Sequence, residues 1–231
     1  MLSVAIIGAN GYVGRALQKA LLGHPQDYSV VSVTRENYAE RQKHAYDIIV
    51  NSAMPSARFW AKQNPEKDFV ETVEKTANLL YRWQFKKFIQ ISSVSARCQL
   101  DTVYGRHKAA AEKLCNFGDN LIVRLGPMYS QELKKGVLVD MLEGKKVFVA
   151  GESRYCFTPL HFVSSWIVSH LDRHGIVEVG AKDGITLRRV AEHLNSNVEF
   201  EGAIDHQEIE SPETNFPNAH DVLDFLDHWE R

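Results

Sequence analysis

The chain has 231 residues, 44% of them hydrophobic and 24% charged, and a formal net charge of -2. This composition predicts a globular protein with a substantial core, and it excludes a disordered tail, a fibre and a small disulfide-stapled scaffold. Because 27 Lys and Arg residues are matched by 29 Asp and Glu residues, no surplus of positive charge is available for a row of nucleic-acid phosphates.

The first half of the chain alternates short β-branched segments with amphipathic ones. This alternation is typical of βαβ units, in which helices connect parallel strands. It therefore predicts a doubly wound α/β fold with a parallel sheet. The expected strands are at 4–7, 30–33, 47–50, 87–91 and 121–124, and the expected helices are at 12–22, 68–83 and 105–114.

The pattern becomes less regular after Gly126. We expect residues 1–130 to form a Rossmann-like dinucleotide-binding domain, and residues 131–231 to form a small substrate-binding lobe with segments that return to the core. In this second part, helices are expected at 137–142, 164–171, 186–194 and 218–229, and strands at 147–149 and 176–179.

Neither a membrane span nor a metal site is expected. No apolar stretch approaches the roughly 20 residues that cross a bilayer. The first residues enter a strand without a charged leader, so a cytoplasmic protein is predicted. The three cysteines are too widely spaced for a disulfide framework or a zinc cage, and no histidine has a cysteine at ligand spacing.

The first expected strand ends in a glycine-rich loop that leads into a helix. In the loop, Gly8 allows a tight turn, Gly11 lets a pyrophosphate approach the backbone, and Gly14 lets the helix pack close to the sheet. The positive end of the helix dipole then faces the phosphates. An ordinary glycine turn is the alternative. The loop residues predicted to bind the dinucleotide are Gly8, Asn10, Gly11, Tyr12, Val13 and Gly14.

The end of the second strand distinguishes the two nicotinamide dinucleotides. An acidic side chain there hydrogen-bonds the ribose of NAD, whereas an arginine accommodates the additional phosphate of NADP. This strand ends in Thr34 and Arg35, and Glu36 comes next. Arg35 favours NADP. NAD remains the alternative, because Glu36 could bind a ribose and Arg35 could be a solvated cation.

Three further residues form a candidate catalytic group. Tyr104 and Lys108 are four residues apart in an expected helix, so they share one face, and an ammonium beside a phenol would lower the pKa of the phenol. Such a phenol can exchange a proton with a substrate oxygen while a hydride moves to or from a nicotinamide. Ser93 follows the fourth strand at the ligand-binding edge of the sheet, where its hydroxyl could hydrogen-bond the same oxygen.

These motifs, in this order, resemble the extended short-chain dehydrogenase/reductase superfamily, the branch of NAD-dependent epimerases, dehydratases and reductases that act on nucleotide sugars. The resemblance extends to about residue 130. It implies that Tyr104 is the acid/base, that Lys108 lowers its pKa and holds the nicotinamide ribose, and that Ser93 polarises the substrate. It also implies that Ser52 and Ala53, at the end of the third strand, flank the adenosine and its ribose.

Two departures from the family pattern narrow the function. The dehydratase branch carries an Asp-Glu pair directly after the serine, and Val94 and Ser95 stand there in this chain, which disfavours a dehydratase. Arg154 resembles the family arginine that contacts a substrate diphosphate, but His161 replaces the aspartate of that segment. Arg154 is therefore a candidate substrate ligand, and a surface or ion-paired cation is the alternative.

The leading hypothesis is an NAD(P)-dependent epimerase or reductase of a nucleotide sugar, which transfers a hydride at a secondary alcohol or ketone. A reductase of a smaller carbonyl substrate and a non-catalytic NAD(P)-binding sensor or subunit are the alternatives. The resemblance also implies a homodimer through the helices at 68–83 and 105–114. The expected partners are thus a small molecule and a second copy of the chain, without nucleic acid or membrane.

Overall fold

The computed structural model describes residues 1–229 of the chain, which forms two compact units. Unit 1 comprises Met1–Leu125 and Ser164–Val177, and unit 2 comprises Gly126–Val163 and Glu178–Arg231. Each unit is therefore assembled from two separate stretches of sequence. The assignment of cofactor binding to residues 1–130 and of substrate binding to residues 131–231 stays a prediction.

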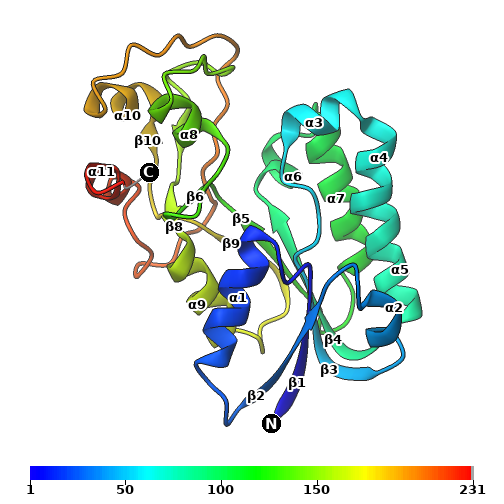
Figure 1. Cartoon of the computed structure of the whole chain (residues 1–231). Helices are drawn as coiled ribbons and strands as arrows, with labels where there is room; N and C mark the ends of the chain where they lie inside the picture. The colour runs from blue at the N-terminus through cyan, green and yellow to red at the C-terminus, as the bar shows by residue number, and fades with distance from the viewer. Residues whose placement is uncertain (230–231) are drawn as a thin grey trace. The chain divides into compact units, whose positions relative to one another are not determined.

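Most of a six-stranded sheet belongs to unit 1 (Figure 1). In spatial order its strands are β2 (Tyr28–Val33), β1 (Leu2–Ile7), β3 (Ala45–Asn51), β4 (Gln84–Ser93), β5 (Leu121–Leu125) and β9 (Gly175–Val179). The pairings of β1 with β2 and β3, of β3 with β4, and of β4 with β5 are parallel. The chain reverses its direction of travel between β1 and β3, and doubly wound sheets bind their ligands at this switch point.

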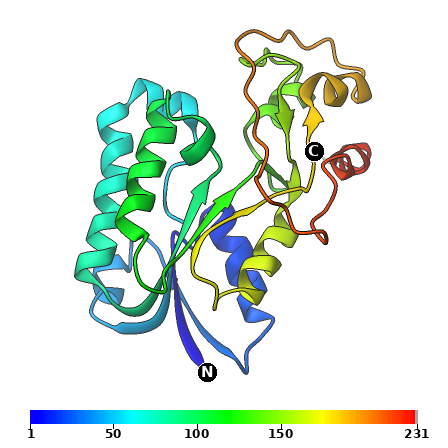
Figure 2. The ribbon, with the colours of Figure 1, turned by 180° about the vertical axis from the view of Figure 1, so that it is seen from behind.

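Helices cover both faces of the sheet, as two opposite views show (Figures 1 and 2). This arrangement confirms the predicted doubly wound α/β fold. None of the helices in residues 1–229 has the length and apolar character needed to cross a membrane. On one face lie α1 (Tyr12–Leu22) and α9 (Leu160–Ser169), and on the other lie α3 (Arg58–Gln63), α4 (Pro65–Phe69), α5 (Lys75–Arg82), α6 (Ser95–Cys98) and α7 (Val103–Cys115), with the short α2 (Tyr38–Arg41) after β2.

The helix expected at 68–83 is continuous but changes its winding. A π-helical segment, η1 (Val70–Glu74), connects α4 to α5, and all three parts pack against α7. Asp68, Thr72 and Thr76 recur every four residues along this helix, and each is at most 1% exposed. A buried polar stripe therefore runs along this helix: Asp68 contacts His107 of α7, and Thr76 accepts a hydrogen bond from Asn51 of β3.

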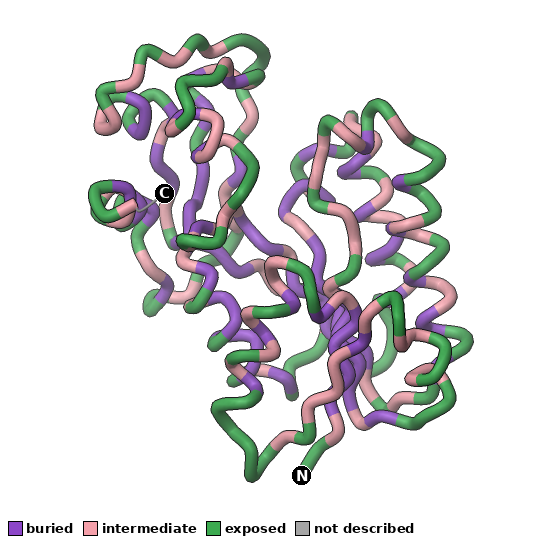
Figure 3. The backbone as a smooth tube through the Cα atoms, viewed as in Figure 1, coloured by how far each residue is buried: buried purple, intermediate pink, exposed green. Residues whose placement is uncertain are grey.

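The inner strands β1, β3, β4 and β5 are buried over much of their length, whereas the edge strand β2 is mostly of intermediate burial (Figure 3). In β1, Val4, Ala5 and Ile6 have no exposed surface, and Ile49 of β3 and Phe88 of β4 are equally buried. Near-continuous apolar sequence is what parallel strands need when helices cover both faces. The same burial explains why these strands could be recognised from short apolar runs.

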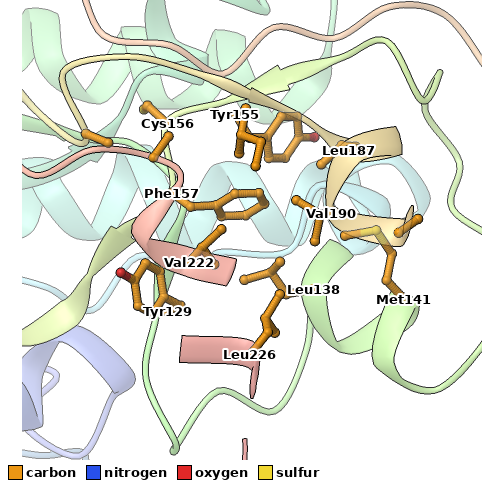
Figure 4. Packing of buried hydrophobic residues seen from close by; sticks show 14 of the residues in the cluster. Tyr129, Leu138, Met141, Tyr155, Cys156, Phe157, Leu187, Val190, Val222 and Leu226 are labelled. Atoms are coloured by element: carbon orange, nitrogen blue, oxygen red, sulfur yellow. The ribbon is translucent and has the colours of Figure 1, made fainter. Parts of the chain in front are cut away.

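Unit 2 has a hydrophobic core of its own (Figure 4). Phe157 is 1% exposed and lies among Leu138, Val190 and Val222, which come from three different helices. The unit contains the helices α8 (Val137–Leu142), α10 (Leu187–His193) and α11 (Asp221–Asp227), and two small sheets that pair β6 (Met128–Tyr129) with β8 (Thr158–Pro159) and β7 (Arg154–Tyr155) with β10 (Ile185–Thr186).

Three elements expected in the second half differ from the structure. The helix predicted at 164–171 is α9, which begins four residues earlier and ends at Ser169. The strand predicted at 147–149 is wrong: Val147 forms an isolated bridge with Phe200, and Phe148 is 74% exposed. A short apolar run does not make a strand where no longer partner strand lies beside it. The last helix is shorter than the predicted 218–229, because the regular helix α11 covers only Asp221–Asp227.

Candidate functional site

The glycine loop connects β1 to α1 at the carboxyl end of the strand. Gly8 has a φ of 80°, which favours glycine, and its N–H donates to the carbonyl oxygen of Val33 at 3.1 Å. A Cβ on Gly14 would lie 2.2 Å from the carbonyl oxygen of Gly8, so only glycine allows α1 to start this close to the loop. Gly11 precedes α1 without capping it by a side chain, and an uncapped helix N-terminus suits an anion. The loop therefore fits a dinucleotide pyrophosphate.

The turn after β2 contains both of the charges considered for cofactor selection. The N–H of Thr34 donates to Oδ1 of Asn37 at 2.8 Å, which closes the turn. Arg35 and Glu36 are exposed on it. A hydrogen bond with Thr34 lowers the pKa of Glu36, so this carboxylate is ionised and held by its neighbour. Preference for NADP through Arg35 stays a prediction.

The end of β3 lies directly against the glycine loop. Ser52 donates its hydroxyl to the carbonyl oxygen of Ile7 at 2.8 Å, which ties the ends of β3 and β1 together. A Cβ on Gly8 would lie 2.8 Å from Cα of Ala53. The structure thus brings Ser52 and Ala53 together with the glycine loop at the switch point of the sheet, which is the arrangement that cofactor binding requires.

Ser93, Tyr104 and Lys108 converge beside the end of β4. Tyr104 is 7% exposed and hydrogen-bonds with the hydroxyl of Ser93. Lys108 is 4% exposed, and its Nζ lies 5.2 Å from the centre of the Tyr104 ring. The three predicted catalytic side chains therefore form one group inside unit 1.

Local sequence explains how α7 presents these side chains. Thr102 caps the helix, because its Oγ1 accepts the N–H of Gly105 at 3.0 Å. A Cβ on Gly105 would lie 2.0 Å from the carbonyl oxygen of Gln99, so glycine allows the first turn of α7 to pack against the segment that follows β4. The cap and the glycine together place Tyr104 beside Ser93.

Burial controls the protonation of the two titratable members. It raises the pKa of Tyr104 to about 12, against the opposing effect of the hydrogen bond with Ser93. It lowers the pKa of Lys108 to about 7, although the negative charges of Asp68 and Glu112 act in the other direction. The shift of Tyr104 is opposite to the one expected from the Tyr104–Lys108 spacing, because burial outweighs the hydrogen bond with Ser93 and the positive charge of Arg58, which both lower the pKa. At neutral pH the phenol is therefore a proton donor.

Glu112 is a buried residue that the sequence analysis missed. Its carboxylate accepts from Nη2 of Arg124 at 2.7 Å and from the hydroxyl of Ser92 at 2.6 Å. Glu112 thus links α7 to Arg124 of β5 and to Ser92 of β4, and these contacts hold the helix that carries Tyr104 and Lys108. The spacing of one further helical turn after Lys108, in an alanine-rich helix, was the signal that could have identified it.

Asp68 and His107 form a second pair that the sequence analysis missed. Nδ1 of His107 lies 2.7 Å from Oδ2 of Asp68. His107 stands between Tyr104 and Lys108 in the sequence of α7. It lies on the side of α7 that meets α4, next to the buried polar stripe.

Arg154 belongs to unit 2 and is engaged in an ion pair. Its Nε donates to Oε1 of Glu208 at 3.0 Å, and the side chain is 45% exposed. This is the ion-paired alternative that its sequence context left open. A role for Arg154 as a substrate phosphate ligand stays a prediction.

The cysteines and the potential metal ligands form no further reactive centre in residues 1–229. Within that range, no group of three or more His, Cys, Asp and Glu side chains is arranged to hold a metal ion. None of the three cysteines forms a disulfide in the part of the chain that the structure describes. Burial raises the pKa of both Cys115 and Cys156 to about 12, which disfavours the reactive thiolate.

Comparison with known proteins identifies a family whose sequence pattern matches this chain. The family described as "NAD dependent epimerase/dehydratase family" matches residues 4–131. No curated protein matches the chain in sequence.

Solved structures share the fold at low sequence identity. The dTDP-4-dehydrorhamnose reductase of Bacillus anthracis, in complex with NADP, aligns with a TM-score of 0.75 and 17% identity over 98% of this chain and 99% of its own. The UDP-glucose 4-epimerase of Thermotoga maritima aligns with a TM-score of 0.72 and 15% identity, over 90% of each chain. The UDP-N-acetylglucosamine 4-epimerase of Methanobrevibacter ruminantium aligns with a TM-score of 0.73 and 14% identity, over 99% and 96%.

Proposed function

Since the chain belongs to the NAD-dependent epimerase/dehydratase family, we propose that it is an NAD(P)-dependent enzyme that transfers a hydride at a secondary alcohol or ketone carbon of a nucleotide sugar. The observation that carries this proposal is the hydrogen bond between the buried phenol of Tyr104 and Ser93, beside Lys108. A phenol used only for packing would not need a hydroxyl at the strand end and a buried lysine around it.

Each member of the group has a distinct role in this proposal. The nicotinamide, when bound, supplies or accepts the hydride. Tyr104 gives its proton to the substrate oxygen in reduction and takes it back in oxidation. Ser93 holds that oxygen next to the phenol, and Lys108 binds the ribose beside the nicotinamide. Because the pKa of Tyr104 is raised to about 12, its protonated form prevails at neutral pH, which favours reduction of a ketone.

The glycine loop and the exposed Arg35 are the proposed cofactor determinants. The loop would hold the pyrophosphate, with Ser52 and Ala53 alongside, and Arg35 would bind the additional phosphate of NADP. The similarity of fold to an NADP-bound reductase supports this choice. Glu36 is the reason to test NAD in parallel, since its carboxylate is ionised at the same turn.

The substrate class is proposed from the structural neighbours. Their names refer to dTDP- and UDP-linked sugars. A nucleoside diphosphate needs a cation, and Arg154 is the proposed one, released from Glu208 when substrate binds.

Replacement of Tyr104 by phenylalanine tests the proposal. The substitution removes one oxygen atom and leaves the ring in its buried site. We expect kcat to fall by roughly 10²- to 10⁴-fold, as for loss of a general acid, while the Kd for the dinucleotide changes by less than about threefold. Turnover would be measured with NADPH and NADH against a panel of nucleotide-linked ketosugars and small ketones, after binding partners are selected by thermal shift.

Tyr81→Phe is the matched control, because Tyr81 is 75% exposed on α5. Its kinetics should equal those of the wild type. If Tyr104→Phe also retained the wild-type rate, the catalytic role would be excluded. Dinucleotide binding without turnover of any substrate class would instead favour a sensor or a subunit.

A further inference from the structure

Asn37 stands at the start of a helix, but its side chain does not cap that helix. It precedes α2, whose first turn receives no hydrogen bond from the side chain. Asparagine is among the preferred N-cap residues, because its side-chain oxygen can accept the free N–H groups of the first helical turn. In this structure the amide bonds to a different segment instead.

The amide of Asn37 binds two backbone groups at the end of β2. Its Oδ1 accepts the N–H of Thr34 at 2.8 Å, and its Nδ2 donates to the carbonyl oxygen of Ser32 at 3.0 Å. β2 lies at the edge of the six-stranded sheet, beside β1. Backbone groups that face outward from an edge strand lack partners in the sheet. Asn37 supplies both a donor and an acceptor to β2, as a neighbouring strand would.

The glycine loop holds the same part of the backbone. The carbonyl oxygen of Val33 accepts the N–H of Gly8 at 3.1 Å and the N–H of Ala9 at 3.3 Å. The N–H of the next residue, Thr34, belongs to the same peptide unit and is the group that Asn37 binds. This peptide unit is therefore fixed by the glycine loop through its oxygen and by Asn37 through its N–H.

The turn closed by Asn37 contains Arg35 and Glu36, which are both exposed. The carboxylate of Glu36 hydrogen-bonds with the side chain of Thr34, so the acid is engaged within the turn itself. The guanidinium of Arg35 has no hydrogen bond or ion pair within the described residues 1–229. The turn thus offers a cation to a ligand from a backbone that is tied to the glycine loop.

We propose that Asn37 is a positioning residue for cofactor selection: it fixes the turn against the glycine loop and so holds Arg35 where its guanidinium meets the additional phosphate of NADP. A backbone that is ordered in advance reduces the entropy lost when a long side chain binds its ligand. The charge-assisted hydrogen bonds between a guanidinium and a phosphate also depend on geometry. This inference rests on the proposed role of Arg35 in NADP binding.

The Kd values of Asn37→Ala for NADP and for NAD, measured by titration calorimetry, test the inference. Alanine removes both hydrogen bonds of the amide and leaves Arg35 in place. We expect the Kd for NADP to rise roughly tenfold, the weaker end of the effect of a hydrogen bond to a charged group. The Kd for NAD, which lacks the additional phosphate, should change by less than about threefold. Asn37→Ser also removes the amide and serves if the alanine variant does not fold.

A double-mutant cycle with Arg35→Ala shows whether Asn37 acts through Arg35. An amide that only stabilised the fold would affect NADP binding by the same factor with and without Arg35. An amide that positions Arg35 has little left to do once the cation is removed. We therefore expect Asn37→Ala to change the Kd for NADP by less than about twofold in the Arg35→Ala background.

Asn64→Ala is the matched control. Asn64 precedes α4 without capping it, and its Nδ2 donates to the carbonyl oxygen of Trp60 at 3.1 Å. It thus resembles Asn37 in its place before a helix and in its bond to a backbone carbonyl. Its hydrogen bonds join it to Trp60 and Asp68 rather than to the turn after β2. Its replacement should change both Kd values by less than about twofold, as expected for an independent site.

The outcomes separate this inference from the proposed function. A lowered preference for NADP in Asn37→Ala that disappears in the Arg35→Ala background supports the inference. Weakened NADP binding in Arg35→Ala, together with an unchanged preference in Asn37→Ala or an equal effect in both backgrounds, overturns the inference and leaves Arg35 as the cofactor determinant. Wild-type NADP affinity in Arg35→Ala contradicts the role of Arg35 and the inference with it, and it leaves the catalytic role of Tyr104 standing.

Discussion

Replacement of Lys108 by methionine should stabilise the protein although it removes a residue of the proposed site. Lys108 is 4% exposed, and burial lowers its pKa from 10.5 to about 7. At about 1.4 kcal/mol per pKa unit, a shift of this size corresponds to roughly 5 kcal/mol against the charged form. Methionine has similar length and no charge. We expect the free energy of unfolding to rise by about 2 to 4 kcal/mol near pH 6, because relaxation around the amine reduces the full penalty.

The pH dependence of this gain identifies its cause. The pKa of Lys108 is lower in the folded chain than in the unfolded chain, so between about pH 7 and pH 10.5 the unfolded chain binds more protons. The contribution of Lys108 to wild-type stability therefore rises with pH across this window, and the variant lacks that rise. The advantage of Lys108→Met should be largest below pH 7 and should shrink as the pH approaches 10.5.

Urea denaturation at a series of pH values measures this difference. Lys113→Met is the control, since Lys113 is exposed on the same helix and its replacement should change stability by less than about 0.5 kcal/mol. A Lys108→Met protein that is less stable than the wild type near pH 6, or whose advantage does not vary with pH, would refute the assignment of a buried, unfavourable ammonium.

Two further predictions concern the glycine loop and the core of unit 2. Gly14→Ala places a Cβ 2.2 Å from the carbonyl oxygen of Gly8. Calorimetry should therefore show at least about tenfold weaker dinucleotide binding, and urea denaturation should show a free energy of unfolding that is lower by about 1 to 3 kcal/mol. Wild-type affinity would contradict the packing role of this glycine. Phe157→Ala removes a fully buried ring and should lower the free energy of unfolding by about 3 to 5 kcal/mol. Phe148→Ala is the control and should change this free energy little, because the side chain of Phe148 is 74% exposed. Equal losses in the two variants would argue against a core at Phe157.

Short-range sequence patterns were sufficient to predict the fold class and to identify many residues of the candidate site. Strands such as β1 and β3 could be recognised because burial on both faces favours runs of apolar residues. The glycine loop was recognisable because a positive φ at Gly8 and the close approach at Gly14 both require glycine. Tyr104 and Lys108 share a helix face by their spacing alone. Where such a pattern had no partner strand, as at 147–149, the prediction failed.

Tertiary structure alone decided the electrostatics of the site. Asp68 and His107 are 39 residues apart in sequence and 2.7 Å apart in space, and no local pattern relates them. The spacing of Tyr104 and Lys108 predicted a lowered pKa for the phenol, yet burial raises it to about 12. Spacing determines which side chains can meet, but a pKa depends on how much water the packing of α4, η1 and α7 leaves around them. That quantity is a property of elements distant in sequence, which become neighbours only in the folded chain.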